Sequence, residues 1–467
     1  MYKNLLRSKT VILFFIIYLV LFILTCKNGF FWDTTHLASR QAWWFYDNNF
    51  KYFFIPSSFD SGHPPFFAML LALLWHLFGV SLLVSHLMML PFILLLICEV
   101  IIISKHYFAK EYLYPSAIIL FNPIVLAQST LVSPDIVLLS FFYLTLNSIL
   151  KKKYVLVILG SIILCAVSMR GMITATILCL FILISNRGSL KDIIRWGLLF
   201  FPGFMVAATF LLLHYVNTGW VGHHPNSPWA PSFEQVDIKG FFRNIVVFAY
   251  RMIDMGMLSL WVLLGIAVVK TKKTFLLKKE TAELLILSML IFIITIMPQF
   301  FYTHLLMHRY LLSFIGIFSL VFFSYCNQNL PLILTKKFSS LAIIVLLSGN
   351  LWIYPDAIAK GWDATLGHLP YYSLRHKALL FIKEHQIPLS SISAAFPYDM
   401  EDKYIDLKND MNKFSDLPPE KAPYVLYSNV ANQYSDDQLR ILKTTFKPVG
   451  IFGKWPIRFV LYKNSAY

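Results

Sequence analysis

The ionisable side chains that could do chemistry in this chain gather in the connections between its apolar segments. The connection formed by residues 27–65 carries several of them, namely Asp33, His36, Asp47, Asp60 and His63. A transporter keeps such groups near the middle of the membrane, whereas an enzyme that acts on a lipid-borne substrate needs them at one membrane face. The placement of these residues therefore favours an enzyme that works at a membrane surface.

Two carboxylates have surroundings that set them apart. Asp33 directly follows the string GFFW, where a substrate arriving from the bilayer would meet it, although a solvated loop acid is the alternative interpretation. Asp135 stands in the string SPD at the head of an expected helix. The positive end of a helix dipole stabilises an acid at that position, so Asp135 needs no further role to explain it.

Composition determines which elements must hold these residues. The chain has 467 residues, of which 58% are hydrophobic and 14% are charged, against roughly 45–50% and about 25% in an ordinary soluble protein. Apolar runs of about 20 residues, the length that crosses a bilayer, recur along it. They are continuous rather than alternating, which excludes a β-barrel and predicts helices. We therefore expect an all-α polytopic membrane protein with about 11–13 transmembrane helices.

The apolar runs give the approximate bounds of these spans. The short run Phe66–Phe78 is expected to be re-entrant or juxtamembrane, because about 13 residues at ~1.5 Å each do not cross a ~30 Å core. The full spans are expected at 11–26, 82–104, 113–131, 135–150, 154–169, 172–186, 193–215, 245–269, 284–303, 310–326 and 338–355. Inside one of them, Arg251 and Asp254 have the i, i+3 spacing of a salt bridge within a helix.

The formal net charge of +16 is explained by topology. Alternate connections carry 18 Lys and Arg residues, against seven in the connections on the other side. The positive-inside bias makes the first set cytoplasmic, which puts the N-terminus in the cytoplasm and the C-terminus outside. Membrane lipids are expected as partners of the chain, and no nucleic-acid partner is expected. The five cysteines lie in or at the ends of expected helices and suggest neither disulfides nor a zinc site.

The final quarter of the chain breaks the membrane pattern. Residues 1–355 are expected to form the membrane domain, with outer loops at 27–65, including juxtamembrane helices, and at 216–243. Residues 356–467 contain 14 basic and 12 acidic residues and no membrane-length run, which predicts a small extracytoplasmic α/β domain. Its helices are expected at 374–385 and 436–444, and its strands at 391–396, 424–428, 449–452 and 457–462.

Five short strings, taken in their order along the chain, resemble the GT-C glycosyltransferases. The most similar type is glycosyltransferase family 39, which includes the protein O-mannosyltransferases and the aminoarabinose transferases. The strings are WDTTHLASR with Asp33, FDSGHPPFF with His63, LVSPD with Asp135, VSMRGM with Arg170 and MHRYLLSF with Arg309.

The resemblance implies transfer of a monosaccharide from a polyprenyl-phosphate donor to a protein, lipid or glycan on the outer face, in a bacterial inner membrane. It makes Asp33 the general base, because an acceptor hydroxyl needs a carboxylate to take its proton. The residues implied to bind the donor phosphate are His63, Arg170 and Arg309. His63 is a departure, since aminoarabinose transferases have Lys there, and imidazole holds a proton only part of the time near neutral pH.

The remaining candidates follow from the chemistry of their side chains. A divalent metal ion shared by Asp135 and a first-loop acid such as Asp60 is possible, and both acids could instead contact the acceptor. Trp220 and Trp229 could line a sugar pocket, or anchor their loop at the interface. Two alternative functions stay open. One is a transporter or flippase for a lipid-linked glycan, and the other is a glycan polymerase or ligase that uses a diphosphate-linked donor.

Overall fold

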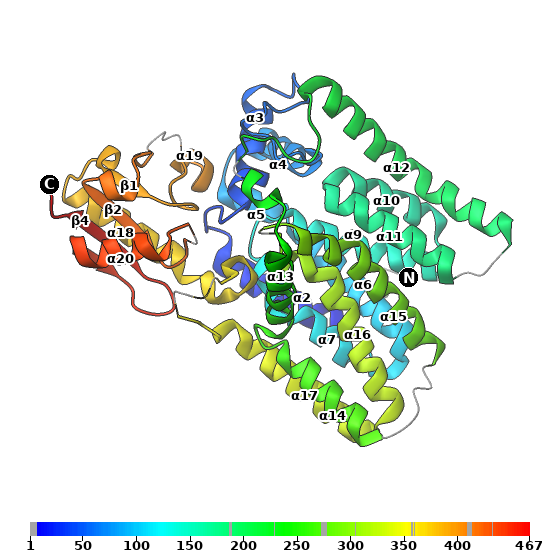
Figure 1. The fold of residues 1–467 in the computed structure, drawn as a ribbon. Coiled ribbons are helices and arrows are strands. Elements are labelled where there is room, and N and C mark those ends of the chain that lie inside the picture. Colours follow the sequence, from blue (N-terminus) through cyan, green and yellow to red (C-terminus); the bar gives the residue numbers. More distant parts are fainter. Residues whose placement is uncertain are drawn as a thin grey trace.

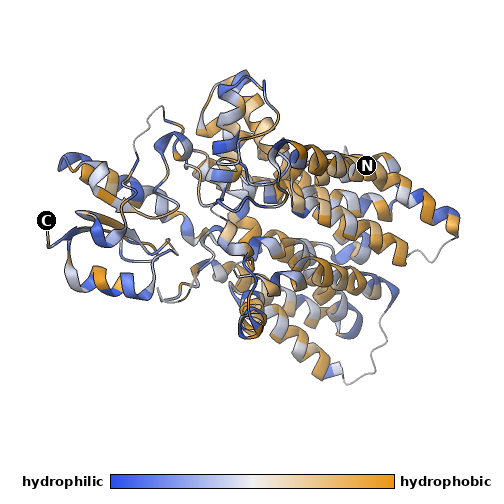
Figure 2. Cartoon of the chain, turned by 45° about the horizontal axis from the view of Figure 1, so that its top comes forward, coloured by the Kyte–Doolittle hydropathy of each residue, from blue (hydrophilic) through white to orange (hydrophobic). Residues whose placement is uncertain are grey.

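The protein has a helical part and a C-terminal part built around a small sheet, which lie at opposite ends of the molecule in Figure 1. The computed structural model describes residues 7–185, 189–227, 229–271, 278–303, 305–355, 358, 360–408, 413–431 and 433–467. Helices of the helical part are strongly hydrophobic along their length, whereas the C-terminal part is mixed (Figure 2). The all-α membrane class with a small C-terminal α/β part is thus confirmed.

The helices of the helical part follow the expected apolar runs closely. Their bounds are α2 (Lys9–Thr25), α4 (Phe66–Phe78), α5 (Leu82–Leu87), α6 (Leu90–Phe108), α7 (Leu113–Leu120), α8 (Pro123–Ser129), α9 (Pro134–Leu150), α10 (Tyr154–Val167), α11 (Met169–Ser185), α12 (Leu190–Thr218), α13 (Ile238–Ile253), α14 (Leu258–Thr271), α15 (Lys279–Ile291), α16 (Leu312–Asn329) and α17 (Leu332–Ser348). Among the described residues, five helical stretches are long and apolar enough to cross a membrane, or up to seven if two bent helix pairs count as spans.

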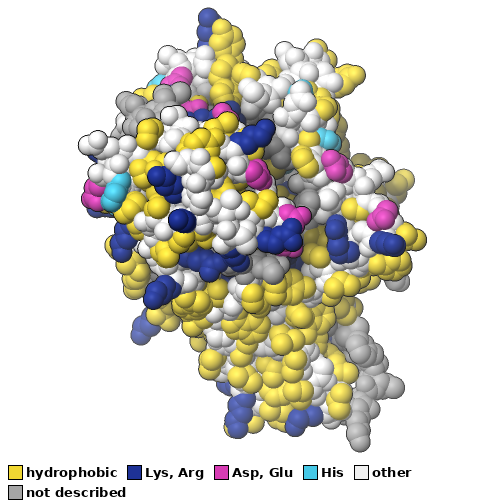
Figure 3. Space-filling view, turned by 60° about the vertical axis from the view of Figure 1, so that its left-hand side comes forward, with side chains coloured by type: hydrophobic (Ala, Val, Ile, Leu, Met, Phe, Trp, Pro, Cys, Tyr) yellow, Lys and Arg dark blue, Asp and Glu magenta, His cyan; other side chains and the backbone are white. Residues whose placement is uncertain are grey.

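The outer surface agrees with a membrane environment. In Figure 3 hydrophobic side chains cover the lower part of the molecule, and Lys and Arg side chains lie below this region and along its upper margin. Four shorter apolar helices of 10–17 residues, α2, α4, α10 and α11, are also found among the described residues. The chain is therefore an integral membrane protein.

One expected span, 113–131, is not a single helix. It divides into α7 and α8, and α8 meets α9 at an angle of 118°. The break has a local cause: the Asn122 side chain accepts a hydrogen bond from the Ile124 amide at 3.0 Å, and Pro123 occupies the first turn of α8. An Asx cap followed by proline starts a new helix whatever the hydrophobicity around it.

The expected span 245–269 is also wrong as a single helix. α13 ends at Ile253 and α14 begins at Leu258, with an angle of 86° between them. Met255 and Gly256 both have positive φ angles, 51° and 81°, which no α-helix accommodates. The turn also prevents the predicted salt bridge from Arg251 to Asp254, because the Asp254 carboxylate instead lies 3.1 Å from the imidazole of His308.

The C-terminal elements confirm the expected secondary structure. A four-stranded sheet has the order β1 (Ile392–Ala394), β2 (Tyr424–Ser428), β4 (Phe459–Asn464), β3 (Phe446–Phe452). β1 pairs with β2 in parallel, and the other neighbours are antiparallel. The two main helices are α18 (Pro370–Glu384) and α20 (Asp436–Thr445).

Contacts with the first loop fasten the C-terminal part to the helical part. The first loop contains the π-helix Thr35–Arg40 and the helix α3 (Gln41–Asp47). Phe31 is fully buried in the same hydrophobic cluster as Tyr371 of α18. Trp43 of α3 donates a hydrogen bond at 3.0 Å to the carbonyl of Lys403. Any site in the first loop therefore has the C-terminal part as its neighbour.

Candidate functional site

Arg309 is the centre of a cluster of charged side chains. It lies in the 3-10 turn His308–Leu311 directly before α16, and it is buried. Its guanidinium contacts the Asp33 carboxylate and lies 3.5 Å from that of Asp363 and 3.9 Å from that of Asp135. The turn before α16 thus gathers one acid from the first loop, one from the head of α9 and one from the C-terminal part.

Arg170, at the start of α11, supplies the second cation. Its guanidinium lies 2.5 Å from the Asp135 carboxylate. It also stacks over the ring of Tyr310, 4.3 Å from the centroid, and Arg309 lies 5.1 Å from the same centroid. Two guanidinium groups thus share one carboxylate and one aromatic ring, an arrangement that holds both at fixed positions.

Hydrogen bonds hold the carboxylate-bearing turns in place. The Ser133 hydroxyl caps α9 by accepting a bond from the Asp135 amide at 3.2 Å, and it donates to the Gln128 side chain at 2.6 Å. Gln128 in turn donates to the carbonyl of Asp363 at 2.8 Å. Asp135 therefore occupies the helix-head position expected from the sequence and belongs to the charged cluster as well.

The turn that carries Arg309 has its own anchor. The Asp254 carboxylate, in the break between α13 and α14, accepts hydrogen bonds from the Tyr354 hydroxyl and the Met255 amide, both at 2.6 Å. Its other oxygen lies 3.1 Å from the ring of His308, which precedes Arg309. The broken helix thus positions the arginine.

The cluster opens into a large cavity of about 710 Å³. Asp33 and Arg170 line it, with side chains that are 16% and 20% exposed, whereas those of Asp135 and Arg309 are only 2% and 3% exposed and lie behind them. Further lining residues come from several parts of the chain, namely His36, His63, Trp229 and Tyr310 from the helical part, and Phe396, Asp399 and Gln433 from the C-terminal part.

His63 lines the cavity, but its protonation differs from that of a free imidazole. Burial, together with the positive charge of Arg170, lowers the pKa of His63 to about 4. The ring is therefore neutral near pH 7, and it can donate a hydrogen bond to a phosphate without supplying positive charge.

Asp60 and Trp220 lie elsewhere and are not among the described residues that line the cavity. Asp60 accepts hydrogen bonds from the Gly62 amide at 2.7 Å and from the His214 ring at 3.0 Å. Trp220 donates from its indole to the Ser57 hydroxyl at 3.1 Å. Both residues tie the first loop to the end of α12 and the turn that follows it.

A divalent metal does not fit the acidic cluster. The described residues contain no group of three His, Cys, Asp or Glu side chains that could hold one. Asp33, Asp135 and Asp363 do converge, but they converge on the guanidinium of Arg309. That cation occupies the position in which a metal shared by these carboxylates would have to bind.

Gly62 gives a test of how the loops around the cavity pack. It has φ = +74°, and a Cβ there would lie 2.2 Å from the carbonyl oxygen of Gly222. We expect Gly62→Ala to lower the unfolding midpoint clearly more than Gly219→Ala. Gly219 is the matched control, since its φ is +77° but nothing lies within 4 Å of its Cβ position. Both changes place alanine at a positive φ, which costs roughly 1–2 kcal/mol. Equal midpoints for the two variants would show that the loops do not approach closely.

Sequence reasoning missed Asp363 and Tyr310. Tyr310 lies within the MHRYLLSF string, next to Arg309. Asp363 stands in the string GWDA, a Trp-Asp pair shortly after the last apolar run. The same signal, an acid after apolar residues at the membrane exit, drew attention to Asp33, so it could have identified Asp363.

Comparison with known proteins finds matches among solved structures. No family model matches the chain, and no curated protein matches its sequence. Two solved structures of ArnT from Cupriavidus metallidurans are similar in fold at 12% identity. The structure bound to undecaprenyl phosphate has a TM-score of 0.53 and matches over 97% of this chain and 98% of that one. The apo structure has a TM-score of 0.50, with 97% of each chain covered. The chain thus has an ArnT-like GT-C fold.

Proposed function

We propose that this protein is a membrane glycosyltransferase that transfers a monosaccharide from a polyprenyl-phosphate donor to an acceptor on the outer face of a bacterial inner membrane. The observation that carries the proposal is the charged cluster of Asp33, Arg170 and Arg309, of which Asp33 and Arg170 line the cavity and Arg309 lies behind them. The fold it shares with ArnT, one structure of which is bound to undecaprenyl phosphate, supports this donor class. The short strings of the sequence favour the family 39 type.

Asp33 is the carboxylate best placed to act as general base. Of the three acids around Arg309 its side chain is the most exposed, at 16% against 2% for Asp135 and 8% for Asp363. An acceptor hydroxyl in the cavity can reach Asp33, while the other two acids hold Arg309 from behind. A base must come within hydrogen-bond distance of the proton that it takes.

The two arginines suit the leaving group. As the acceptor oxygen bonds to the anomeric carbon, the bond from that carbon to the phosphate oxygen breaks, and the acceptor proton passes to Asp33. The departing polyprenyl phosphate gains negative charge, which fixed cations stabilise more strongly than water does. Arg170 lines the cavity and would contact the phosphate first, with Arg309 behind it. The hydrogen bonds around Ser133 and Asp254 keep both groups positioned before the donor arrives.

The nature of the copurifying lipid tests the donor class. The protein is purified in mild detergent and its bound lipids are extracted for mass spectrometry. We expect polyprenyl lipids with one phosphate, and fewer of them in the Arg170→Gln variant. A lipid with two phosphates would favour a glycan polymerase or ligase instead. Movement of a labelled lipid-linked glycan across vesicles, without cleavage of its sugar bond, would favour a flippase.

A comparison of Trp220 and Trp229, which lie in the same loop, distinguishes a substrate-binding role from a structural one. Trp229 lines the cavity and packs edge-to-face on His36, whereas Trp220 is buried away from it. We expect Trp229→Leu to raise the KM for the donor about three- to tenfold, since it loses one aromatic contact. Trp220→Leu should leave that KM unchanged and lower the unfolding midpoint. Release of polyprenyl phosphate gives the first quantity, and the reverse pattern would exclude Trp229 from the donor site.

A further inference from the structure

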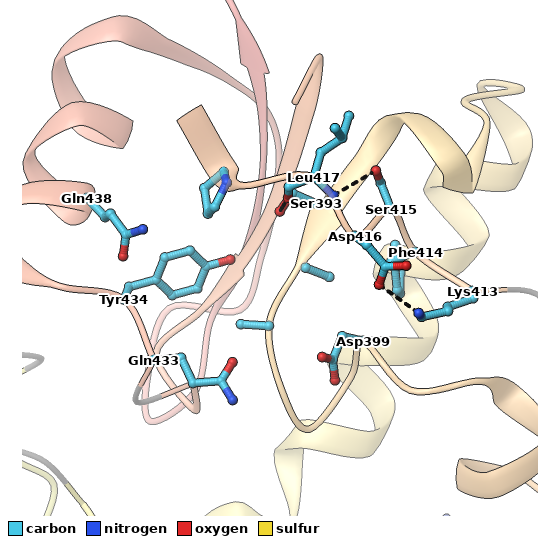
Figure 4. A pocket seen from close by; sticks show the side chains of 13 residues that line it. Ser393, Asp399, Lys413, Phe414, Ser415, Asp416, Leu417, Gln433, Tyr434 and Gln438 are labelled. Carbon is cyan, nitrogen blue, oxygen red and sulfur yellow. Dashed lines mark hydrogen bonds and ion pairs between the residues drawn. The ribbon is translucent and has the colours of Figure 1, made fainter. Parts of the chain in front are cut away.

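A second pocket, of about 260 Å³, lies in the C-terminal part; we call it the C-terminal cleft. Figure 4 shows the carboxylates of Asp399 and Asp416 on one side of it, and the side chains of Gln433, Tyr434 and Gln438 on the other. The strand β1 contributes the floor through Ser393. The volume of the cleft is slightly below the range for small-ligand sites, which begins at roughly 300 Å³.

The polar groups of the cleft leave capacity for hydrogen bonds to a ligand. One carboxylate oxygen of Asp399, Oδ1, is buried and has no hydrogen-bond partner among the described residues. An acceptor in this state costs free energy until a donor reaches it. The Gln433 side-chain oxygen accepts from the Phe396 amide at 3.0 Å, which leaves its two amide protons for other partners.

The charges of the cleft disfavour an anionic ligand. Lys413 and Asp416 neutralise each other in an ion pair of 2.6 Å. Burial raises the pKa of Asp399 to about 6, so near pH 7 its carboxylate is mostly ionised and accepts hydrogen bonds from donors such as hydroxyl groups. The aromatic side chains of Phe414 and Tyr434 supply apolar surface beside these donors and acceptors. Hydrogen-bonding groups of both kinds next to aromatic surface suit a neutral, polyhydroxylated ring.

The cleft adjoins the cavity that holds Asp33. Asp399 and Gln433 line both the cleft and the cavity. Phe396, whose backbone amide donates a hydrogen bond to the Gln433 side chain, lines the cavity. A molecule that occupies the cleft therefore contacts two residues that also line the cavity. An acceptor larger than one sugar would need such a second binding position outside the reaction site.

We infer that the C-terminal cleft binds a neutral sugar unit of the acceptor, so that the acceptor of this enzyme is a saccharide-bearing molecule. This inference rests on the proposed function, since it gives the acceptor class for the same cavity. The neighbouring hydroxyl of the acceptor then points into the cavity toward Asp33. The C-terminal part becomes the element that selects the acceptor.

The test uses the full chain in lipid nanodiscs and saturation-transfer NMR with two neutral probes, maltotriose and chitotriose. We expect at least one probe to bind the wild-type protein, and to bind about tenfold more weakly after Asp399→Asn. Asp416→Ala, which changes a residue of the cleft alone, should also weaken binding. Asp437→Ala is the matched control, because Asp437 pairs with Arg440 at the same i, i+3 spacing on an exposed helix face.

The outcomes separate this inference from the proposed function. Failure of both probes to bind, or equal binding by wild type, Asp399→Asn and Asp416→Ala, would overturn the inference. Binding that survives in the Asp33→Asn variant supports it, since the cleft needs no catalytic base. A failure of the proposed function would appear instead as absence of a monophosphate polyprenyl lipid, and it would leave saccharide binding intact.

Discussion

Replacing Asp33 with Asn should reduce sugar transfer by about 10²- to 10⁴-fold, the usual contribution of a positioned general base. The amide has nearly the shape of the carboxylate but cannot take the acceptor proton. Arg309 keeps two acidic partners, Asp135 and Asp363, so the variant should fold and still bind the donor lipid. Release of polyprenyl phosphate from a radiolabelled donor, with membrane extract as the acceptor source, measures the rate.

Asp47→Asn is the matched control for this experiment. Asp47 is also a first-loop carboxylate in an ion pair, with Lys403 at 2.9 Å, but it does not line the cavity. Transfer should continue at close to the wild-type rate in this variant. If Asp33→Asn were as active as Asp47→Asn, the base would have to be another group.

Replacing Arg309 with Gln should affect both stability and transfer. The change leaves Asp33, Asp135 and Asp363 without their shared cation, and breaking a buried ion pair in this way costs about 3–5 kcal/mol. Transfer should fall by about 10²-fold or more, because a fixed positive charge near the leaving phosphate is lost. Thermal unfolding in detergent and the donor assay measure the two effects.

Arg170→Gln separates these two effects. The Arg170 side chain is 20% exposed and pairs with one carboxylate, so its loss should lower the unfolding midpoint much less than the loss of Arg309. Transfer should nevertheless fall strongly, since Arg170 faces the cavity. An Arg170→Gln enzyme with unchanged transfer would mean that the phosphate does not bind at this end of the cavity.

Much of the site follows from the order of its motifs. Asp33, Asp135, Arg170 and Arg309 are far apart in the sequence, yet the positive-inside bias puts the connections that carry them on one side of the membrane, and the structure brings them together. The helix positions follow from the apolar runs, because a backbone in hydrocarbon must satisfy its hydrogen bonds within a helix. The C-terminal strands follow from alternation and turn residues.

The rest of the arrangement depends on contacts that a sequence does not contain. Asp60 is as close to His63 in sequence as a site residue would be, but it turns away to bond His214 of α12. Asp363 joins the cluster from the C-terminal part, where the hydrogen bond from Gln128 and the packing of Phe31 against α18 hold the two parts together. Hydrophobicity alone also concealed the two helix breaks, although Asn122 and Gly256 marked them locally.

The most direct test of the account is the position of the phosphate in a structure of this protein with bound undecaprenyl phosphate. We predict that the phosphate oxygens lie within hydrogen-bond distance of Arg170 or Arg309, with Asp33 facing the side where the sugar would be attached. A phosphate bound outside the cavity, with both guanidinium groups still held only by their carboxylates, would contradict the account.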